Sequence, residues 1–404
     1  MALTAPGFKI RDDLYWVGAQ DPQRRLFDII MPTPYGTTYN SYVLKGDQTA
    51  VIETADEKMA DRYLKDLGGL TDLAAIDYII LDHTEPDHSG SLARLLSAAP
   101  KATVIASKAG ARFAREIVKA DFPVQIVGEG DTLDLGRGRV LRFIDAPFLH
   151  WPDSIFTWLE SERLLFSGDA FGAHLAGDIG EDGGGDYAKA YRDYFDAIMR
   201  PFSPQVRQAT AKLKDLPVEV ICPAHGPVHL KDARHWIDLY EDWASEPRKE
   251  APIVLIAYAS AYGYTKKLAE AIAKGVGEVG GVVAHVYDMT GLEPAALARH
   301  VDMADGLLVG SPTMNRDAVP PAWAFLSHVS AVINRNKPAG AFGSYGWSGE
   351  AVKLLEERMK GLQLKVPLPG LKVNFAPSEE DLAKAREFGK SFAALVKEGR
   401  AASA

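Results

Sequence analysis

The chain has 404 residues, a length that favours more than one domain. Its 47% hydrophobic residues are typical of a globular protein, and its formal net charge is −9. The acidic balance argues against a nucleic-acid partner. The sequence shows no apolar run long enough to cross a bilayer and no secretory signal, and its one cysteine is Cys222. We therefore expect a cytoplasmic protein without disulfides or membrane contacts.

Short apolar runs predict many strands in the first part of the chain. They lie at residues 41–44, 49–53, 78–81, 103–106, 140–145, 155–159, 164–167 and 218–221. Helical periodicity appears between some of them, at residues 56–67, 90–98, 108–119 and 187–199. This mixture indicates an α/β domain built as a sandwich of sheets flanked by helices.

Pro247 and Pro252 bracket a charged stretch that predicts a domain boundary, with domains at residues 1–248 and 253–404. After it, strands and helices alternate regularly. The predicted strands are 253–259, 282–287, 307–310, 339–344 and 371–375, and the predicted helices are 265–279, 320–333, 349–361 and 379–397. This order is typical of a doubly wound, parallel five-stranded sheet.

Four potential metal ligands occupy six consecutive residues directly after the strand predicted at 78–81. They are His83, Glu85, Asp87 and His88. Two imidazoles and two carboxylates suit a divalent metal such as iron, manganese or zinc. A polar loop without a ligand would rarely need all four, so this hexapeptide predicts a metal site.

Three further ligand-type side chains follow apolar strands. His150 comes after the strand at 140–145, Asp169 follows Ser167-Gly168, and His225 lies in the turn Pro223-Ala224-His225-Gly226. Each residue alone is more often structural than ligating. Convergence of all three at one edge of the sheets would explain why each stands at a strand end.

The order of these residues resembles the metallo-β-lactamase superfamily, which usually has His-x-His-x-Asp-His in the first cluster. Glu85 stands where the second histidine would be. That pattern resembles the flavodiiron proteins, or A-type flavoproteins, which consist of a metallo-β-lactamase-like αββα sandwich and a flavodoxin-like domain. The segments 35–42 and 167–172 are similar to that family as well.

The resemblance implies two iron sites. It assigns His83, Glu85 and His150 to one iron, Asp87, His88 and His225 to the other, and Asp169 to both. His229, four residues after His225, is an alternative last ligand. His174 is a candidate pocket residue, and the histidine that we expect near Phe27-Asp28 in many relatives has no counterpart in this chain.

Three loops at predicted strand ends form the candidate flavin site. The first fits the flavodoxin-type phosphate loop, in which hydroxyls, backbone amides and a helix N-terminus bind phosphate. In a flavodoxin fold the other two lie beside the flavin ring, where Tyr345 or Trp347 could pack, although Trp347 could also be a core aromatic. No Gly-x-Gly-x-x-Gly motif stands at the turn after the strand predicted at 253–259, which favours FMN over a dinucleotide. The candidate residues are Ser260, Tyr262, Gly263, Tyr264, Thr265, Ser311, Pro312, Thr313, Met314, Asn315, Ser344, Tyr345, Gly346, Trp347, Ser348 and Gly349.

The resemblance implies an oxidoreductase in which FMN passes electrons to two irons that reduce dioxygen to water, nitric oxide to nitrous oxide, or both. It also implies a head-to-tail homodimer or a dimer of dimers. Because the chain has no Cys-x-x-Cys segment, the resemblance implies an external donor, a rubredoxin or a similar small protein. Two alternatives are a binuclear zinc hydrolase with an accessory flavin domain and a metal-free flavin electron carrier; Glu85 argues against the first and the full ligand set against the second.

Overall fold

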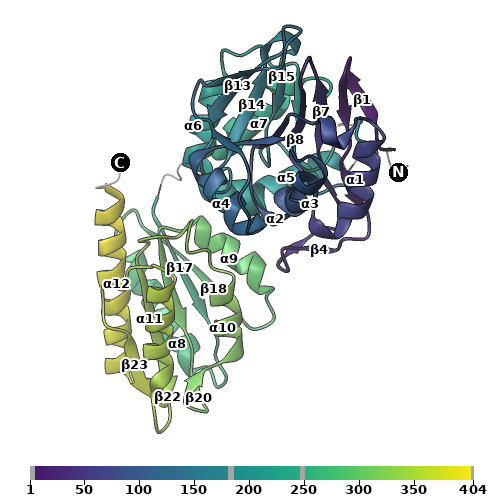
Figure 1. Ribbon diagram of the computed structural model, residues 1–404. Coiled ribbons are helices and arrows are strands. Elements are labelled where there is room, and N and C mark those ends of the chain that lie inside the picture. Colours follow the sequence, from purple (N-terminus) through teal and green to yellow (C-terminus); the bar gives the residue numbers. More distant parts are fainter. Residues whose placement is uncertain (1–4, 181–185, 246–250, 402–404) are drawn as a thin grey trace. The chain divides into compact units, whose positions relative to one another are not determined.

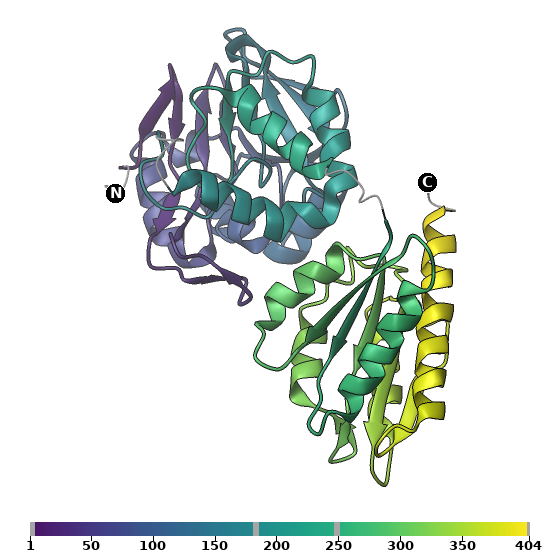
Figure 2. The same ribbon diagram turned by 180° about the vertical axis from the view of Figure 1, so that it is seen from behind.

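The computed structural model describes residues 5–180, 186–245 and 251–401, seen from opposite sides in Figures 1 and 2. The chain divides into two compact units, Met1–Glu246 and Pro247–Ala404. Most of the stretch that predicts the boundary, residues 246–250, lies outside the described residues. Within the described ranges, no helix has both the length and the apolar character that a membrane span requires.

Two sheets form the centre of the first unit. The larger sheet has the order β1 (Phe8–Arg11), β2 (Leu14–Trp16), β7 (Tyr42–Lys45), β8 (Thr49–Ile52), β9 (Tyr78–Leu81), β10 (Thr103–Ala106) and β11 (Val124–Ile126). The smaller has β12 (Thr132–Asp134), β13 (Val140–Asp145), β14 (Ile155–Leu159), β15 (Leu164–Phe166) and β16 (Val220–Cys222). Trp16 and Tyr42 of the larger sheet share a buried cluster with Phe143 and Phe166 of the smaller, so the sheets pack face to face.

Helices cover the outer face of each sheet. On the larger sheet, Val43 and Ile79 pack with Tyr63 of α1 (Ala60–Gly68) and Leu95 of α3 (Leu92–Ala98), and α4 (Lys108–Val118) completes this layer. On the smaller sheet lie α5 (Tyr187–Tyr194), α6 (Ser203–Leu213) and α7 (Ala233–Ala244), the teal helices in front of this unit in Figure 2. The predicted αββα sandwich is therefore confirmed.

Short elements at one edge of this sandwich complete the unit. Strand β3 (Ala19–Asp21) pairs with β6 (Thr37–Tyr39), and β4 (Leu26–Phe27) forms a hairpin with β5 (Met31–Pro32). A one-turn helix, α2 (Pro86–Ser89), follows β9. The 3₁₀ turns are η1 (Glu57–Met59), η2 (Leu73–Ala75), η3 (Glu160–Glu162) and η5 (Arg200–Phe202).

The second unit is a doubly wound parallel sheet with the order β18 (Val283–Asp288), β17 (Ile253–Tyr258), β19 (Gly306–Gly310), β22 (Ala339–Tyr345) and β23 (Leu371–Asn374). One face carries α9 (Pro294–Asp302), α10 (Pro320–Ser327) and α11 (Glu350–Gly361). The other face carries α8 (Tyr264–Gly277) and α12 (Glu379–Ala401), and α8 lies in front of the sheet in Figure 2. The five predicted parallel strands are thus confirmed.

Close contact between α8 and α12 depends on two glycines. A Cβ at Gly275 would lie 1.9 Å from the backbone oxygen of Arg386, and one at Gly389 would lie 2.1 Å from that of Ile272. Neither position has room for a side chain, so the two helix backbones pack directly against each other.

Some predicted helices differ from the observed ones. The helix predicted at 320–333 ends at Ser327, with His328 as its C-cap, so residues 328–333 lie outside it. The helix predicted at 187–199 is α-helical only to Tyr194 and continues as the π-helical segment η4 (Phe195–Met199). Helices α6 and α9 were not predicted, although Pro294 in the first turn of α9 is a typical start signal.

Candidate metal centre and flavin loops

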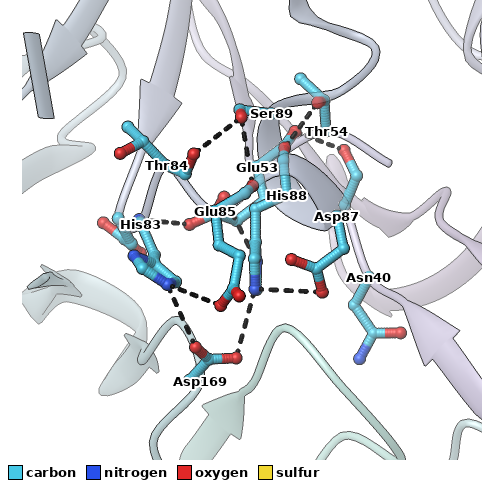
Figure 3. Close-up of polar contacts among 12 residues, drawn as sticks. Asn40, Glu53, Thr54, His83, Thr84, Glu85, Asp87, His88, Ser89 and Asp169 are labelled. Atoms are coloured by element: carbon cyan, nitrogen blue, oxygen red, sulfur yellow. Dashed lines mark hydrogen bonds and ion pairs between the residues drawn. The ribbon is translucent and has the colours of Figure 1, made fainter. Parts of the chain in front are cut away.

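The hexapeptide begins at the carboxyl end of β9, where a strand leads into a short helix. His83 and Glu85 lie on the connection after the strand, whereas Asp87 and His88 belong to α2, whose first residue is Pro86. The strand on one side and the helical turn on the other fix the backbone. Figure 3 shows His83, Glu85, Asp87 and His88 pointing into one space.

Loops of the smaller sheet deliver the other three predicted residues to the same space. His150 lies between β13 and β14, Asp169 follows β15, and His225 follows β16. The site therefore forms where the ends of strands from both sheets meet, a location that no single segment could create.

The seven side chains form two groups. His83, Glu85, His150 and Asp169 make the first, which we call group A, and Asp87, His88 and His225 make the second, group B; the possible ligand atoms within each lie within 4.8 Å of one another. In group A, Glu85 Oε2 lies 3.3 Å from His83 Nε2 and 2.9 Å from His150 Nε2. In group B, Asp87 Oδ2 lies 3.1 Å from His225 Nε2 and 3.5 Å from His88 Nε2.

Asp169, a member of group A, contacts the histidines of both groups, those of each group with a different carboxylate oxygen. Its Oδ2 lies 3.4 Å from His83 Nε2 and 3.3 Å from His150 Nε2. Its Oδ1 lies 3.2 Å from His88 Nε2 and 3.4 Å from His225 Nε2. A carboxylate placed in this way can bridge two metal ions, and Tyr194 donates a hydrogen bond to the same Oδ1 at 2.8 Å.

The chemistry of the seven residues fits two cations. Both carboxylate oxygens of Asp87, His88 Nε2 and Asp169 Oδ2 are buried and find no hydrogen-bond partner among the described residues, although unpaired buried polar atoms are rare. Burial alone lowers the pKa of His150, but its close contacts with the carboxylates of Asp169 and Glu85 raise it to about 9. Imidazole and carboxylate donors held this close together are the arrangement that a divalent cation would occupy.

Contacts outside the seven residues orient three of the imidazoles. His83 Nδ1 lies 3.2 Å from Asp153 Oδ2, and His225 Nδ1 donates to the Thr38 backbone oxygen at 2.5 Å. His88 Nδ1 faces Glu53 Oε2 at 3.7 Å. With Nδ1 directed outward, each ring turns Nε2 toward the centre, the usual arrangement of a metal-binding histidine.

Two other histidines lie near the groups but outside them. His174 Nδ1 is 2.8 Å from the Thr37 hydroxyl, and its ring lies 4.3 Å from the Phe27 ring and 5.1 Å from that of His225. Burial, together with the neighbouring His225, holds the pKa of His174 well below its usual value, so this pocket residue is neutral. His229 Nε2 instead contacts the Phe171 backbone oxygen at 2.8 Å.

Asp28 stands where the sequence lacks the expected histidine. It lies in the turn between β4 and β5, and burial together with the nearby Glu85 charge raises its pKa to about 6. The sequence does not indicate that Asp28 lies near Glu85, nor that Glu53, Asp153 and Tyr194 contact the two groups. Single polar residues at strand and helix ends form no recognisable pattern.

The predicted flavin residues lie on three loops at the carboxyl ends of β17, β19 and β22 and on the elements that follow these loops, except Ser344 and Tyr345, which are the last residues of β22. Gly263, with φ +81°, precedes α8, and Ser260 Oγ accepts from the Lys266 backbone N–H at 3.2 Å. The hydroxyls of Thr265, in the first turn of α8, and Ser344, near the end of β22, are 2.9 Å apart. This contact links the end of the first loop to the start of the third. The open N-terminus of α8 suits a phosphate.

Aromatic side chains on these loops are accessible to a planar ligand. Tyr262 is 82% and Trp347 88% exposed, so Trp347 is not a core aromatic. On the second loop, Thr313 and Met314 form the strand β20, which pairs with β21 (Asp317–Ala318). Hydroxyls near a helix N-terminus beside exposed aromatic rings fit a phosphate-bearing flavin.

Both units of the chain are similar to known protein families. Residues 37–226 match the family model described as ODP family beta lactamase, and residues 256–389 match that of flavodoxin. A flavo-diiron protein of Clostridium acetobutylicum is 41% identical over 399 residues, which cover 97% of this chain and 100% of that protein. This chain belongs to the flavodiiron protein family.

Two further relatives support this assignment over nearly the whole chain. A nitric oxide reductase of Moorella thermoacetica is 34% identical, covering 96% of this chain and 98% of its own. The solved rubredoxin oxygen:oxidoreductase of Desulfovibrio gigas superposes with a TM-score of 0.72 at 30% identity, covering 96% of this chain and 98% of its own. This flavodiiron protein is an oxidoreductase with FMN and a diiron centre as its cofactors.

Proposed function

We propose that this flavodiiron protein reduces dioxygen to water, nitric oxide to nitrous oxide, or both, with electrons supplied by an external donor. The observation that carries the proposal is Asp169, which faces group A with one oxygen and group B with the other. A carboxylate shared in this way supports two metal ions held side by side.

In this proposal, His83, Glu85 and His150 hold one iron, Asp87, His88 and His225 hold the other, and Asp169 contacts both. Three carboxylates among seven ligands make a harder site than a cluster of histidines and favour iron over zinc. When bound, FMN supplies a store of two electrons and the irons supply two adjacent one-electron centres.

The surrounding side chains shield the site and control hydrogen bonding there. Phe27 and His174 pack beside His225, which keeps bulk water from that side of group B. His174 is neutral, and its buried Nε2 has no hydrogen-bond partner among the described residues, so it can bind a small polar ligand. Burial raises the pKa of Tyr194, so its hydroxyl keeps its proton and donates to Asp169.

We propose FMN as the entry point for electrons and a rubredoxin or a similar small protein as the donor. The name of the Desulfovibrio gigas relative supports this choice. Exposed Tyr262 and Trp347 at the flavin loops give such a donor an accessible face. The buried thiol of Cys222, the one cysteine of the chain, suits the reducing cytoplasm in which we place the protein.

We further propose a head-to-tail homodimer, alone or as half of a dimer of dimers. Its support is the turn between β4 and β5, where Ile29 and Ile30 are 85% and 79% exposed although Phe27 of the same hairpin is buried against the His225 ring. An Ile29→Asp/Ile30→Asp variant should sediment as a monomer. A variant that remains dimeric would exclude this turn from the interface.

The decisive experiment combines metal analysis with an electrode assay. Anaerobically purified protein should contain about two irons and one FMN per chain. After chemical reduction it should consume dioxygen, nitric oxide or both in a gas-selective electrode. Zinc in place of iron, together with ester or thioester hydrolysis, would overturn the proposal.

A matched pair of variants tests the last ligand. His225→Asn should lose iron, because His225 Nε2 faces both Asp87 and Asp169. His229→Asn should keep its iron, because His229 contacts Phe171 and Tyr187 instead. The reverse result would transfer the assignment to His229.

A further inference from the structure

Glu53 is a buried carboxylate held in an unusual backbone conformation beside both metal groups. It follows β8, is 1% exposed and has φ +59°, a left-handed conformation that residues other than glycine rarely adopt. Its backbone N–H donates to the Ile80 oxygen at 2.8 Å, and its backbone oxygen accepts from the Ser41 hydroxyl at 2.9 Å. Such conformations concentrate at functional sites, where surrounding contacts maintain them.

The two oxygens of this carboxylate face different groups. Oε1 accepts the backbone N–H of His83, a member of group A, at 3.0 Å. Oε2 lies 3.7 Å from Nδ1 of His88, a member of group B, and makes no hydrogen bond with the described residues. Figure 3 shows Glu53 between the backbone of His83 and the ring of His88.

The His88 ring must carry its proton on Nδ1 if Nε2 is to bind a metal ion, since a neutral imidazole has one N–H and one acceptor nitrogen. Burial raises the pKa of the Glu53 carboxyl, and the positive charge of cations held in the two groups would oppose that rise and keep the carboxylate ionised. An ionised carboxylate accepts hydrogen bonds and cannot donate them, so in the metal-loaded site Oε2 favours a proton on Nδ1. Among the described residues, no backbone oxygen forms a hydrogen bond with this nitrogen, unlike Nδ1 of His225, which donates to Thr38. The carboxylate oxygen that faces His88 Nδ1 in this part of the chain is Glu53 Oε2.

We propose that Glu53 is a positioning residue that fixes the tautomer and ring orientation of His88 and thereby sets the affinity of group B for iron. The inference rests on the proposed ligand assignment. It makes group B dependent on a residue that binds no metal itself, while the same carboxylate holds the backbone at the start of the hexapeptide.

Glu53→Gln gives a sharp test, because an amide has one acceptor oxygen and one donor nitrogen. The oxygen is needed by the His83 N–H, so the amide nitrogen must face His88 Nδ1. A ring that accepts there carries its proton on Nε2, the nitrogen directed at Asp87 and Asp169. We expect group B to lose iron affinity about ten- to a hundredfold while group A keeps its iron.

Asp153→Asn is the matched control. A single oxygen, Asp153 Oδ2, accepts from Thr84 N at 2.8 Å and from the Thr84 hydroxyl at 2.6 Å, and it also faces His83 Nδ1 at 3.2 Å. The other oxygen makes no hydrogen bond with the described residues, so the amide nitrogen can take its place. The Asp153→Asn variant would then lose a charge but keep the acceptor, and both irons should remain.

The experiment reconstitutes the full-length wild type and both variants anaerobically with ⁵⁷Fe(II), and measures iron and FMN per chain and the Mössbauer spectrum. Loss of one iron signal in Glu53→Gln, with FMN content unchanged and Asp153→Asn like the wild type, is the expected result. Two wild-type iron signals in Glu53→Gln would overturn the inference. Equal iron loss in both variants would also overturn it, because charge rather than the tautomer would then be responsible.

The wild-type protein tests the same contact if Glu53→Gln does not fold. After reconstitution with Co(II), His88 should give a shifted, exchangeable imidazole N–H proton resonance with a nuclear Overhauser effect to the Glu53 methylene protons. Absence of that resonance would overturn the inference. Failure of the wild type to bind iron would instead refute the proposed function, so the two failures can be told apart.

Discussion

Replacing Tyr194 with phenylalanine removes one hydroxyl and tests how strongly Asp169, the carboxylate proposed to bridge the irons, depends on it. The Tyr194 hydroxyl donates to Asp169 Oδ1 at 2.8 Å, and both side chains are 2% exposed, so water cannot take over the contact without rearrangement. A hydrogen bond to a charged group contributes about 1.5–3 kcal/mol. Because about 1.4 kcal/mol corresponds to a factor of ten, Tyr194→Phe should weaken iron retention about ten- to a hundredfold.

The assay is anaerobic competition between the protein and a ferrous chelator, followed by iron content per chain. Tyr191→Phe is the control, since Tyr191 lies on the same helix, is fully buried and donates at 2.8 Å to the backbone oxygen of Trp236, away from both groups. Its iron retention should equal that of the wild type. Equal retention by Tyr194→Phe and the wild type would refute the reasoning that this hydroxyl supports Asp169 as a ligand.

Three other predictions concern stability. Chelation of iron should lower the melting temperature of the first unit, because a ligand at a thousand times its Kd adds about 4 kcal/mol to the stability of the folded state. The melting temperature of the flavin-binding unit, followed by FMN fluorescence, should not change. A shift in both melting temperatures would contradict this prediction. Gly275→Ala should destabilise the second unit by about 1–3 kcal/mol in thermal unfolding, because the new Cβ would lie 1.9 Å from the Arg386 oxygen, whereas Gly277→Ala, with nothing within 4 Å, should not. Burial lowers the pKa of Lys337 from 10.5 to about 8, so between these pH values the unfolded chain binds a proton that the folded chain does not. The free energy of unfolding should therefore rise with pH across this window by roughly 3 kcal/mol. Denaturant titrations should find this rise in the wild type and not in Lys337→Met.

The sequence predicted the parts of the site that follow strand ends. His83, Asp169 and His225 each come directly after an apolar run, and parallel or paired strands bring such positions to one edge. The substitution of Glu85 for a histidine separated the redox interpretation from the hydrolytic one. Glycine and hydroxyl residues after β17 predicted a strand-to-helix turn in the same way, and the binding of phosphate by that turn stays a prediction.

The sequence could not predict the contacts that orient these residues. Glu53 is one carboxylate at the end of a strand, and its importance depends on the left-handed backbone that turns it under His83 and His88. Tyr194 reaches Asp169 from a helix that ends there in a π-helical segment, a change that periodicity does not indicate. Such contacts arise from tertiary packing, which a local pattern does not contain.

The spread of group members along the chain has a consequence for synthesis. All four members of group A, from His83 to Asp169, leave the ribosome before His225, which completes group B. Strand β16, which precedes His225, also completes the smaller sheet by pairing with β15. Neither the smaller sheet nor the full set of seven side chains is therefore complete until β16 and His225 have been made, so we expect the proposed two-iron site to load only after this last strand has joined the sandwich.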